Sequence, residues 1–315
     1  MDANPPDSAS ARWAVLLLAH GAPDRLADIP EFLLNVRGGR KLPEQAVQEI
    51  IHRYGLIGGG SPLLRLTQQQ ARALANLLSH PVYVGMRNWR PFIADTVRQM
   101  SEAGVEQIIA LCLAPHNSQT SIGLYKKYLD EAVANNAPQL AVVFIESWHD
   151  HSLLIQAFRE RASAALAHVE REAGGPVPVV FTAHSVPQKT IEDGDPYADQ
   201  VWETANRVAG AMSLAEYRVA FQSQGMTADP WIGPTVESQI DELAAMGQRH
   251  ILLVPVGFVS DHVEILYDID ILIREYGESK GVTVHRSESL NDSPVFIQAL
   301  ADIVSARMAE PPSTA

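Results

Sequence analysis

Two apolar, β-branched segments of this chain each end abruptly at side chains that could bind a metal or move protons. The first, residues 179–182, leads to His184, and the second, residues 254–259, leads to Asp261, His262 and Glu264. Buried strands of a parallel sheet are continuous apolar runs of this kind, and ligands bind at their carboxyl ends. We therefore predict that the function lies where these two segments end.

The side chains at these ends suit a transition metal or a proton transfer. An imidazole such as that of His184 binds a divalent metal or accepts a proton near neutral pH. Glu264 begins a predicted helix in which Asp268 lies four residues further on, so the two carboxylates share one helix face and could form a row for an incoming cation. This mixture of nitrogen and oxygen donors suits Fe, Co, Ni or Zn better than Mg or Ca.

Each of these residues also has a purely structural explanation. An isolated histidine such as His184 could cap an element or fill a core, and acidic residues favour a helix N-terminus because of its dipole. Asp261 could cap the predicted helix and still support a metal site. The presence of the second cluster, at another predicted strand end, is what favours a functional interpretation of His184.

Short apolar runs alternate with longer amphipathic runs along the chain. We expect strands over residues 14–19, 82–86, 107–113, 141–145, 177–182, 217–222, 250–256 and 282–286. We expect helices over residues 43–54, 67–78, 91–103, 121–134, 151–171, 197–211, 234–246, 264–275 and 294–308. This alternation predicts an α/β fold in which parallel sheets are flanked by helices.

The two halves of the chain resemble each other. In each half a predicted strand ends in Ala-His, at His20 and at His184, and a later helix closed by glycine leads into another strand. We therefore predict two similar lobes with a cleft between them, over residues 12–148 and 177–309, joined by a crossover helix and linker over 149–176. Residues 1–11 and 310–315 are expected to be loose tails.

Composition excludes several classes of function. The 315 residues include 24 Lys or Arg and 37 Asp or Glu, a formal net charge of −13, which argues against binding to nucleic acid or an anionic membrane. Cys112 is the only cysteine, so one chain can hold neither an internal disulfide nor a cysteine-ligated iron–sulfur cluster. No apolar stretch approaches the roughly 18 residues of a membrane span. We expect no integral membrane segment and a cytoplasmic location.

The candidate segments resemble signature segments of the ferrochelatase family. The resemblance is carried by residues 183–187 (AHSVP), 194–197 (GDPY), 222–225 (QSQG) with 230–231 (PW), and 257–267 (GFVSDHVEILY). It extends upstream through residues 58–62 (GGGSP), 83–86 (YVGM) and 113–118 (LAPHNS), in the expected order and over nearly the whole chain. The chain is most similar to the soluble, monomeric bacterial members without an iron–sulfur extension, several of which act on coproporphyrin III instead of protoporphyrin IX.

The resemblance implies a chelatase-like fold and an enzyme of haem biosynthesis that inserts Fe(II) into a porphyrin with release of two protons. His184 and Glu264 match the family's metal-binding and proton-handling pair, and Asp268 would extend the metal path. His262, Asp261 and Trp231 would support them. No cofactor beyond the Fe(II) substrate is implied.

The porphyrin's carboxylates require local cations in an acidic protein. The positions that match porphyrin-binding residues of the family are His20, Arg37, Arg53, Tyr54, Ser61 and Tyr125. Arginine suits this role because its planar guanidinium can make two bonds to one carboxylate.

Three positions depart from the family pattern. His20 stands where soluble bacterial relatives often carry tyrosine, so an imidazole could bind the product's iron more strongly. Asn88 stands where some relatives have histidine, which weakens the case for a second metal site there. Leu272 replaces a common glutamate beyond Asp268, so the outer metal path would be shorter or would recruit Asp270.

Two other interpretations remain open at this point. A cobalt chelatase acting on another tetrapyrrole would share the fold and the His-plus-Glu site, but should carry more basic residues around the cleft. A non-catalytic haem- or metal-binding protein would need no base beside the ring.

Overall fold

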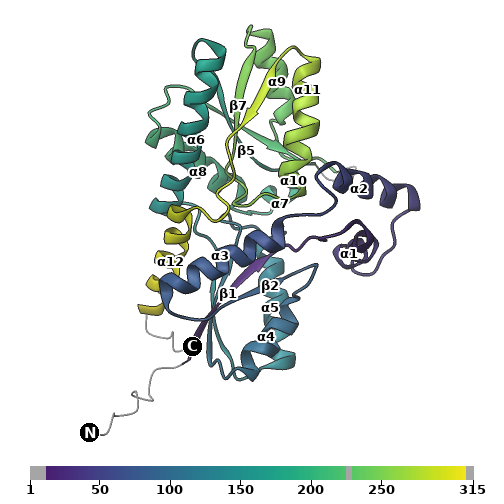
Figure 1. The fold of residues 1–315 in the computed structure, drawn as a ribbon, viewed down its shortest axis with the longest axis vertical. Helices are drawn as coiled ribbons and strands as arrows, with labels where there is room; N and C mark the ends of the chain where they lie inside the picture. The colour runs from purple at the N-terminus through teal and green to yellow at the C-terminus, as the bar shows by residue number, and fades with distance from the viewer. Residues whose placement is uncertain (1–11, 225–228, 310–315) are drawn as a thin grey trace.

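The fold consists of two α/β lobes, one above the other in Figure 1. The computed structural model describes residues 12–224 and 229–309, so both predicted tails and Gly225 of the QSQG segment lie outside the described residues. Within the described part, no helix combines the length and apolar character needed to cross a bilayer.

Each lobe is built on a four-stranded parallel sheet, which confirms the predicted fold class. The first sheet has the order β2-β1-β3-β4 and the second β6-β5-β7-β8. The strands are β1 (Trp13–Ala19), β2 (Val82–Met86), β3 (Gln107–Cys112), β4 (Ala141–Ile145), β5 (Val179–His184), β6 (Arg218–Gln222), β7 (His250–Pro255) and β8 (Thr283–Arg286). The shared order explains why the two halves of the sequence resemble each other.

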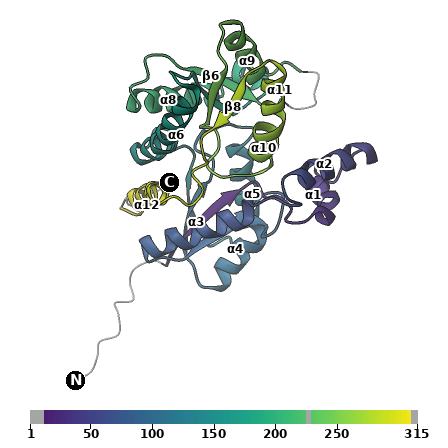
Figure 2. The same ribbon diagram turned by 45° about the horizontal axis from the view of Figure 1, so that its top comes forward.

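Helices cover both faces of these sheets (Figures 1 and 2). The first lobe has a 3-10 turn (Leu26–Asp28), α1 (Ile29–Val36), α2 (Glu44–Leu56), α3 (Leu63–Leu78), α4 (Ile93–Glu102) and α5 (Ile122–Asn136). Helix α6 (Ser152–Ala173) connects β4 to β5. The remaining helices are α7 (Gln188–Glu192), α8 (Tyr197–Ala211), α9 (Val236–Ala245), α10 (Val263–Leu266), a π-helix (Asp268–Ile273), α11 (Arg274–Ser279) and α12 (Pro294–Ala309).

The lobes share one apolar core as well as having cores of their own. Helix α12 returns from the second lobe and packs against both α3 and α6. There the rings of Trp148 and Phe296 stack with centroids 6.1 Å apart. Because burial of such surface stabilises each contact by about 25 cal/mol per Å², this shared core holds the lobes together around the cleft. The exact lobe boundaries stay a prediction.

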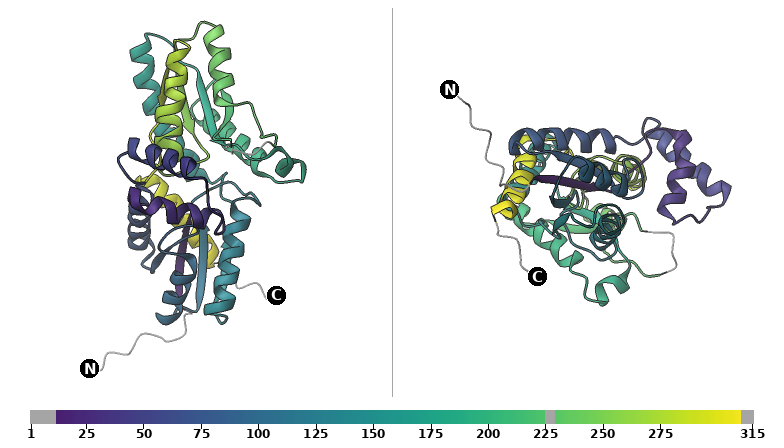
Figure 3. Two further views of the ribbon diagram at one scale, coloured as in Figure 1. Left: turned by 90° about the vertical axis from the view of Figure 1, so that its right-hand side faces the viewer. Right: turned by 90° about the horizontal axis from the view of Figure 1, so that it is seen from below.

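Three helical segments differ from the sequence-based expectation, and one of them is the short helix α7, which was not predicted. Helix α1 was not predicted; with α2 it extends from the side of the molecule beside the junction of the lobes (Figure 3), and Phe32, Leu33, Tyr54 and Trp89 form a small core beneath the pair. The single helix expected over residues 264–275 is instead α10, the π-helix and the start of α11.

Close backbone contact joins the two predicted strand ends. A Cβ atom added at Gly257, just after β7, would lie 2.7 Å from both Cα and Cβ of Ala183, the residue before His184. Only glycine allows the chain to pass this close, so Gly257 sets the spacing between the His184 and Glu264 segments.

Replacing Gly257 with alanine should therefore destabilise the protein. We expect a loss of about 1–3 kcal/mol from overpacking, measured as a lower urea midpoint. Gly210→Ala is the matched control, because Gly210 is exposed on α8 with no atom near its added Cβ, and alanine there should raise stability by about 0.5–1 kcal/mol. Equal midpoints for the two variants would contradict this account.

Candidate active site

The carboxyl ends of the central strands of both sheets open onto one cleft. His20 follows β1, His184 ends β5, and Glu264 lies in α10, shortly after β7. A cavity of about 780 Å³ lies between them, and an adjoining cavity of about 460 Å³ shares five lining residues with it: His20, Leu63, His184, His262 and Glu264. The cleft is therefore continuous, and both lobes contribute to it.

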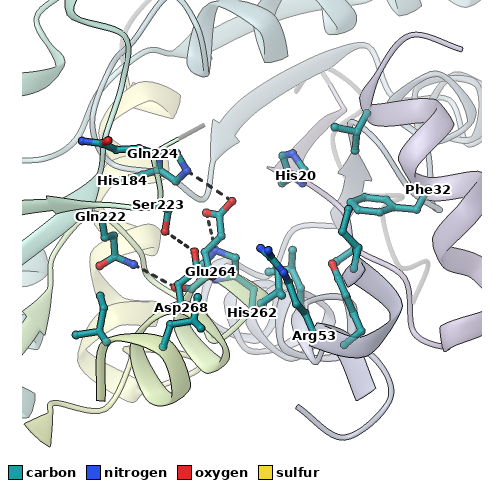
Figure 4. Close-up of a pocket in the computed structure, with 18 of the residues that line it drawn as sticks. His20, Phe32, Arg53, His184, Gln222, Ser223, Gln224, His262, Glu264 and Asp268 are labelled. Atoms are coloured by element: carbon teal, nitrogen blue, oxygen red, sulfur yellow. Dashed lines mark hydrogen bonds and ion pairs between the residues drawn. The ribbon is translucent and has the colours of Figure 1, made fainter. Parts of the chain in front are cut away.

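The two residues predicted to do the chemistry meet in this cleft. Nε2 of His184 lies 3.8 Å from Oε1 of Glu264, and Nε2 of His262 lies 3.4 Å from Oε2 of the same carboxylate (Figure 4). The side chains of His184 and Glu264 are 31% and 37% exposed, because they face the cavity. Both can therefore be reached by a ligand.

Each of the three histidines has its orientation fixed by its own backbone. Nδ1 of His20 donates to the carbonyl of Gly21, Nδ1 of His184 to that of Ser185, and Nδ1 of His262 to that of Ser260. Such a bond places a proton on Nδ1 and leaves Nε2 as the nitrogen that meets the ring's other neighbours. The local fold thus determines which nitrogen of each ring remains for further contacts.

The three Nε2 atoms have different surroundings. Nε2 of His262 faces the Glu264 carboxylate, which favours a proton on this nitrogen. The bond to Glu264 outweighs burial and raises the pKa of His262. Nε2 of His20 accepts a hydrogen bond from Nδ2 of Asn88 at 3.0 Å. Burial, aided by the charge of Arg87, lowers the pKa of His20 to about 4, so this ring is neutral at pH 7.

Glu264 is held in its ionised form. Burial in the cleft favours the neutral acid, but His184, His262 and His20 together outweigh it and hold the pKa of Glu264 well below its usual range. An ionised carboxylate beside the His184 imidazole can bind a cation or accept a proton from His184.

A second carboxylate continues from Glu264 along the cleft. Asp268 begins the π-helix and accepts a hydrogen bond from the Ser223 hydroxyl, and burial raises its pKa. Leu272 lies one turn further and also lines the cavity. Asp270 does not replace it, because its carboxylate makes two bonds of 2.8 Å to the guanidinium of Arg286 on β8.

The predicted porphyrin-binding residues divide into two groups. Arg53, Tyr54 and His20 line the larger cavity, and Tyr125 lines the smaller one. Arg53 also pairs with Glu49 at 3.2 Å and lies over the ring of Tyr267. By contrast, neither Arg37, which is exposed, nor Ser61, which is buried, lines either cavity.

The supporting residues also differ in position. Trp231 lines the smaller cavity, with its ring centroid 6.5 Å from that of His184. Asp261 lines neither cavity; it bonds to Ser289 and Asn291 and so holds the loop before α10. The expectation that Asp261 caps the helix was wrong, because the N-cap residue of α10 is His262 and no side chain caps it.

Sequence reasoning missed Arg87 as a site residue. It follows β2 and lines the smaller cavity, with its guanidinium over the ring of Tyr125. Its Nη1 atom is buried and has no hydrogen-bond partner among the described residues. A buried donor without a partner is costly, which indicates a place for an anionic ligand. A basic residue directly after a predicted strand was the available signal.

Asn88→Ala tests the assigned state of His20. The present hydrogen bond requires an unprotonated Nε2, so its loss should raise the His20 pKa from about 4, although burial and Arg87 keep it below 6.5. An NMR titration of the imidazole nitrogens measures this. Asn136→Ala, on the surface of α5, is the control; an identical His20 titration in both variants would refute the assignment.

The family model and the similar curated proteins point to one family. The ferrochelatase family model matches residues 12–308. A ferrochelatase of Acidobacterium capsulatum is 48% identical over 92% of this chain and 93% of its own length. Coproporphyrin III ferrochelatases of Geobacillus kaustophilus and Bacillus subtilis are 37% and 35% identical, covering 94% and 93% of this chain and 96% and 97% of their own lengths.

Solved structures share the fold at low sequence identity. SirB from Bacillus subtilis with Fe3+ superimposes with a TM-score of 0.61 at 13% identity, covering 95% of this chain and 96% of that one. The sirohydrochlorin chelatase SirB from Bacillus subtilis subspecies spizizenii, in complex with cobalt, gives 0.59 at 11% identity, covering 96% and 98%. At these identities the similarity concerns the fold alone.

Proposed function

The chain belongs to the ferrochelatase family, and we propose that it inserts Fe(II) into a porphyrin held in the cleft between its lobes. It is a porphyrin metal chelatase of haem biosynthesis. The observation that carries the proposed site is the meeting of His184 and Glu264, 3.8 Å apart, in a cavity reached from both lobes.

The chemistry of a porphyrin determines what the site must do. A free porphyrin carries two pyrrole protons, and its nitrogen lone pairs lie in the ring plane, so a metal can enter only when the ring bends and the protons leave. A cleft that binds the bent ring better than the flat ring lowers the barrier to this step.

In this proposal His184 and Glu264 together remove the pyrrole protons and deliver the metal. Nε2 of His184 accepts a pyrrole proton or passes the metal, and the ionised Glu264 beside it attracts the Fe(II) cation. The protonated His262 holds Glu264 in place. Asp268, with the Ser223 hydroxyl, offers oxygen ligands further along the same face of the cleft, which supports an entry path for hydrated metal.

His20 would cover the cleft from the side of the first lobe. Its Nε2 lone pair is engaged by Asn88, so we infer that His20 contacts the ring without binding the inserted iron. This pairing offsets the stronger iron affinity expected when a histidine stands in place of tyrosine, and it favours release of the product.

The cations in the cleft support one of the two candidate porphyrins. Arg53 lines the larger cavity and Arg87 the smaller, where its unpartnered Nη1 suits a carboxylate. Coproporphyrin III carries propionates where protoporphyrin IX carries vinyl groups. We therefore propose coproporphyrin III as the substrate, in keeping with the names of several relatives.

His184→Ala and Glu264→Gln should each reduce iron insertion by at least about a hundredfold while porphyrin still binds, because both residues act on the metal and proton steps. Anaerobic assays with Fe(II) follow the porphyrin absorbance, and fluorescence quenching follows binding. His52→Ala, at an exposed position on α2, should retain the normal rate. Near-normal turnover in either site variant would remove the site assignment, and stoichiometric binding without turnover in the unmodified protein would remove the proposed activity.

Arg53→Ala should chiefly raise KM, by about tenfold for coproporphyrin III, because a charged hydrogen bond to the substrate is lost equally in ground and transition states. Arg65→Ala, at an exposed site on α3 outside both cavities, is the control. Rates on both porphyrins decide the substrate. A kcat/KM no higher for coproporphyrin III would contradict the substrate choice, and a fall in kcat alone in Arg53→Ala would contradict its role.

Three further expectations accompany this function. We propose that the chain acts as a monomer in the cytoplasm and needs no cofactor beyond the Fe(II) substrate. The single cysteine of the sequence supports the expectation of a cluster-free enzyme.

A further inference from the structure

A cluster of possible metal ligands lies at the far end of the second lobe from the cleft. It comprises Glu172 near the end of α6, His250 at the first position of β7, and His285 on β8. One ligand atom from each residue lies within 4.8 Å of the others. The proposed chelation residues follow the opposite end of β7, roughly 16 Å away at about 3.3 Å per strand residue.

The sheet itself brings the two histidines together. In the parallel register of β7 and β8, His285 pairs with Leu252, and His250 lies two residues before Leu252. Residues two apart point to the same face, so both imidazoles lie on one face of the sheet. Their rings are nearly parallel and lie edge to edge, with centroids 5.4 Å apart.

The nitrogen atoms of the pair have the spacing of two metal ligands. Nδ1 of His250 and Nε2 of His285 lie 3.1 Å apart. Two ligands at roughly 2.0–2.1 Å from one ion in tetrahedral geometry lie about 3.3 Å from each other, so this separation fits a shared ion once the rings turn from facing each other to face the ion. Without an ion, a proton on one ring must bridge the pair; a metal would take its place as the proton moves to the other ring nitrogen or to solvent.

The surrounding charges are compatible with a cation. The Glu172 side chain is exposed and has no hydrogen bond or ion pair within the described part of the chain, so its carboxylate is available. Arg274 is the nearby positive charge, and its guanidinium lies 3.6 Å from the Asp270 carboxylate, which partly neutralises it. His168, one turn before Glu172 on α6, could add a fourth ligand.

We propose that Glu172, His250 and His285 form a second metal site, separate from the chelation cleft, that binds a divalent transition metal of the Zn(II), Co(II) or Ni(II) type. Two imidazoles and one carboxylate match these ions better than Mg or Ca. Because the ligands come from α6, β7 and β8, a bound ion stabilises the second lobe and takes no direct part in iron insertion.

The test is zinc binding by the full chain after removal of metals, measured by calorimetry. All variants are made in a Glu264→Gln background, so that the cleft contributes equally to each. Glu172→Gln, an exposed and conservative change, should weaken one binding event by more than about tenfold. Glu160→Gln, also exposed on α6, is the matched control and should bind zinc as the background protein does.

Stability gives a second measurement, in case His285→Ala lowers the folded population. Zinc at a large excess over its dissociation constant should raise the Tm of the control protein by about 2–5 °C and that of Glu172→Gln or His285→Ala by much less. With Co(II), the control should show tetrahedral d–d absorption that His285→Ala lacks. Equal zinc affinity, stoichiometry and Tm shift in Glu172→Gln and Glu160→Gln would overturn the proposal. Iron insertion by Glu172→Gln alone should match that of the unmodified protein, so the two sites are tested separately.

Discussion

The ionised carboxylate of Glu264 is the feature on which the rest of the site depends. Removing a charge from bulk water is costly unless neighbouring groups compensate it. Here His262 compensates Glu264 directly, and Nε2 of His184 lies on its other side, 3.8 Å away. An incoming divalent cation would provide the same compensation, which supports the proposed metal-binding role of this carboxylate.

The fold keeps His184 and Glu264 at a fixed separation. Strands β5 and β7 are neighbours in one parallel sheet, so His184 and the loop leading to Glu264 emerge at the same edge. The contact of Gly257 with Ala183 sets their separation. Asp261 accepts hydrogen bonds from Ser289 and Asn291 and so holds the loop before α10 in place. The opposite wall is His20, fixed by Asn88 on the first lobe. The shared core around α12 links the two walls.

The elements that the sequence predicted correctly were those that local patterns of apolar residues encode. Buried parallel strands are apolar throughout, so each of the eight was anticipated within about two residues, and the pairing of His184 with Glu264 followed from strand ends that share an edge. The sequence did not predict the π-helix, because its wider turn results from packing Ile269 and Ile273 into the core while Asp268 faces the cleft. The choice between a shorter metal path and recruitment of Asp270 could not be made from the sequence, because its partner Arg286 lies on β8. Arg87 and the Asn88–His20 bond likewise depend on contacts distant in sequence.

The central claim is that a porphyrin lies between His20 and the His184–Glu264 pair. The most direct measurement is a crystal structure of the protein with a bound metal-free porphyrin. The account predicts that the ring occupies the joined cavities, with Nε2 of His184 and the Glu264 carboxylate facing its centre from one side and His20 on the other. A ring bound outside this cleft, or with His184 and Glu264 at its edge, would contradict the account.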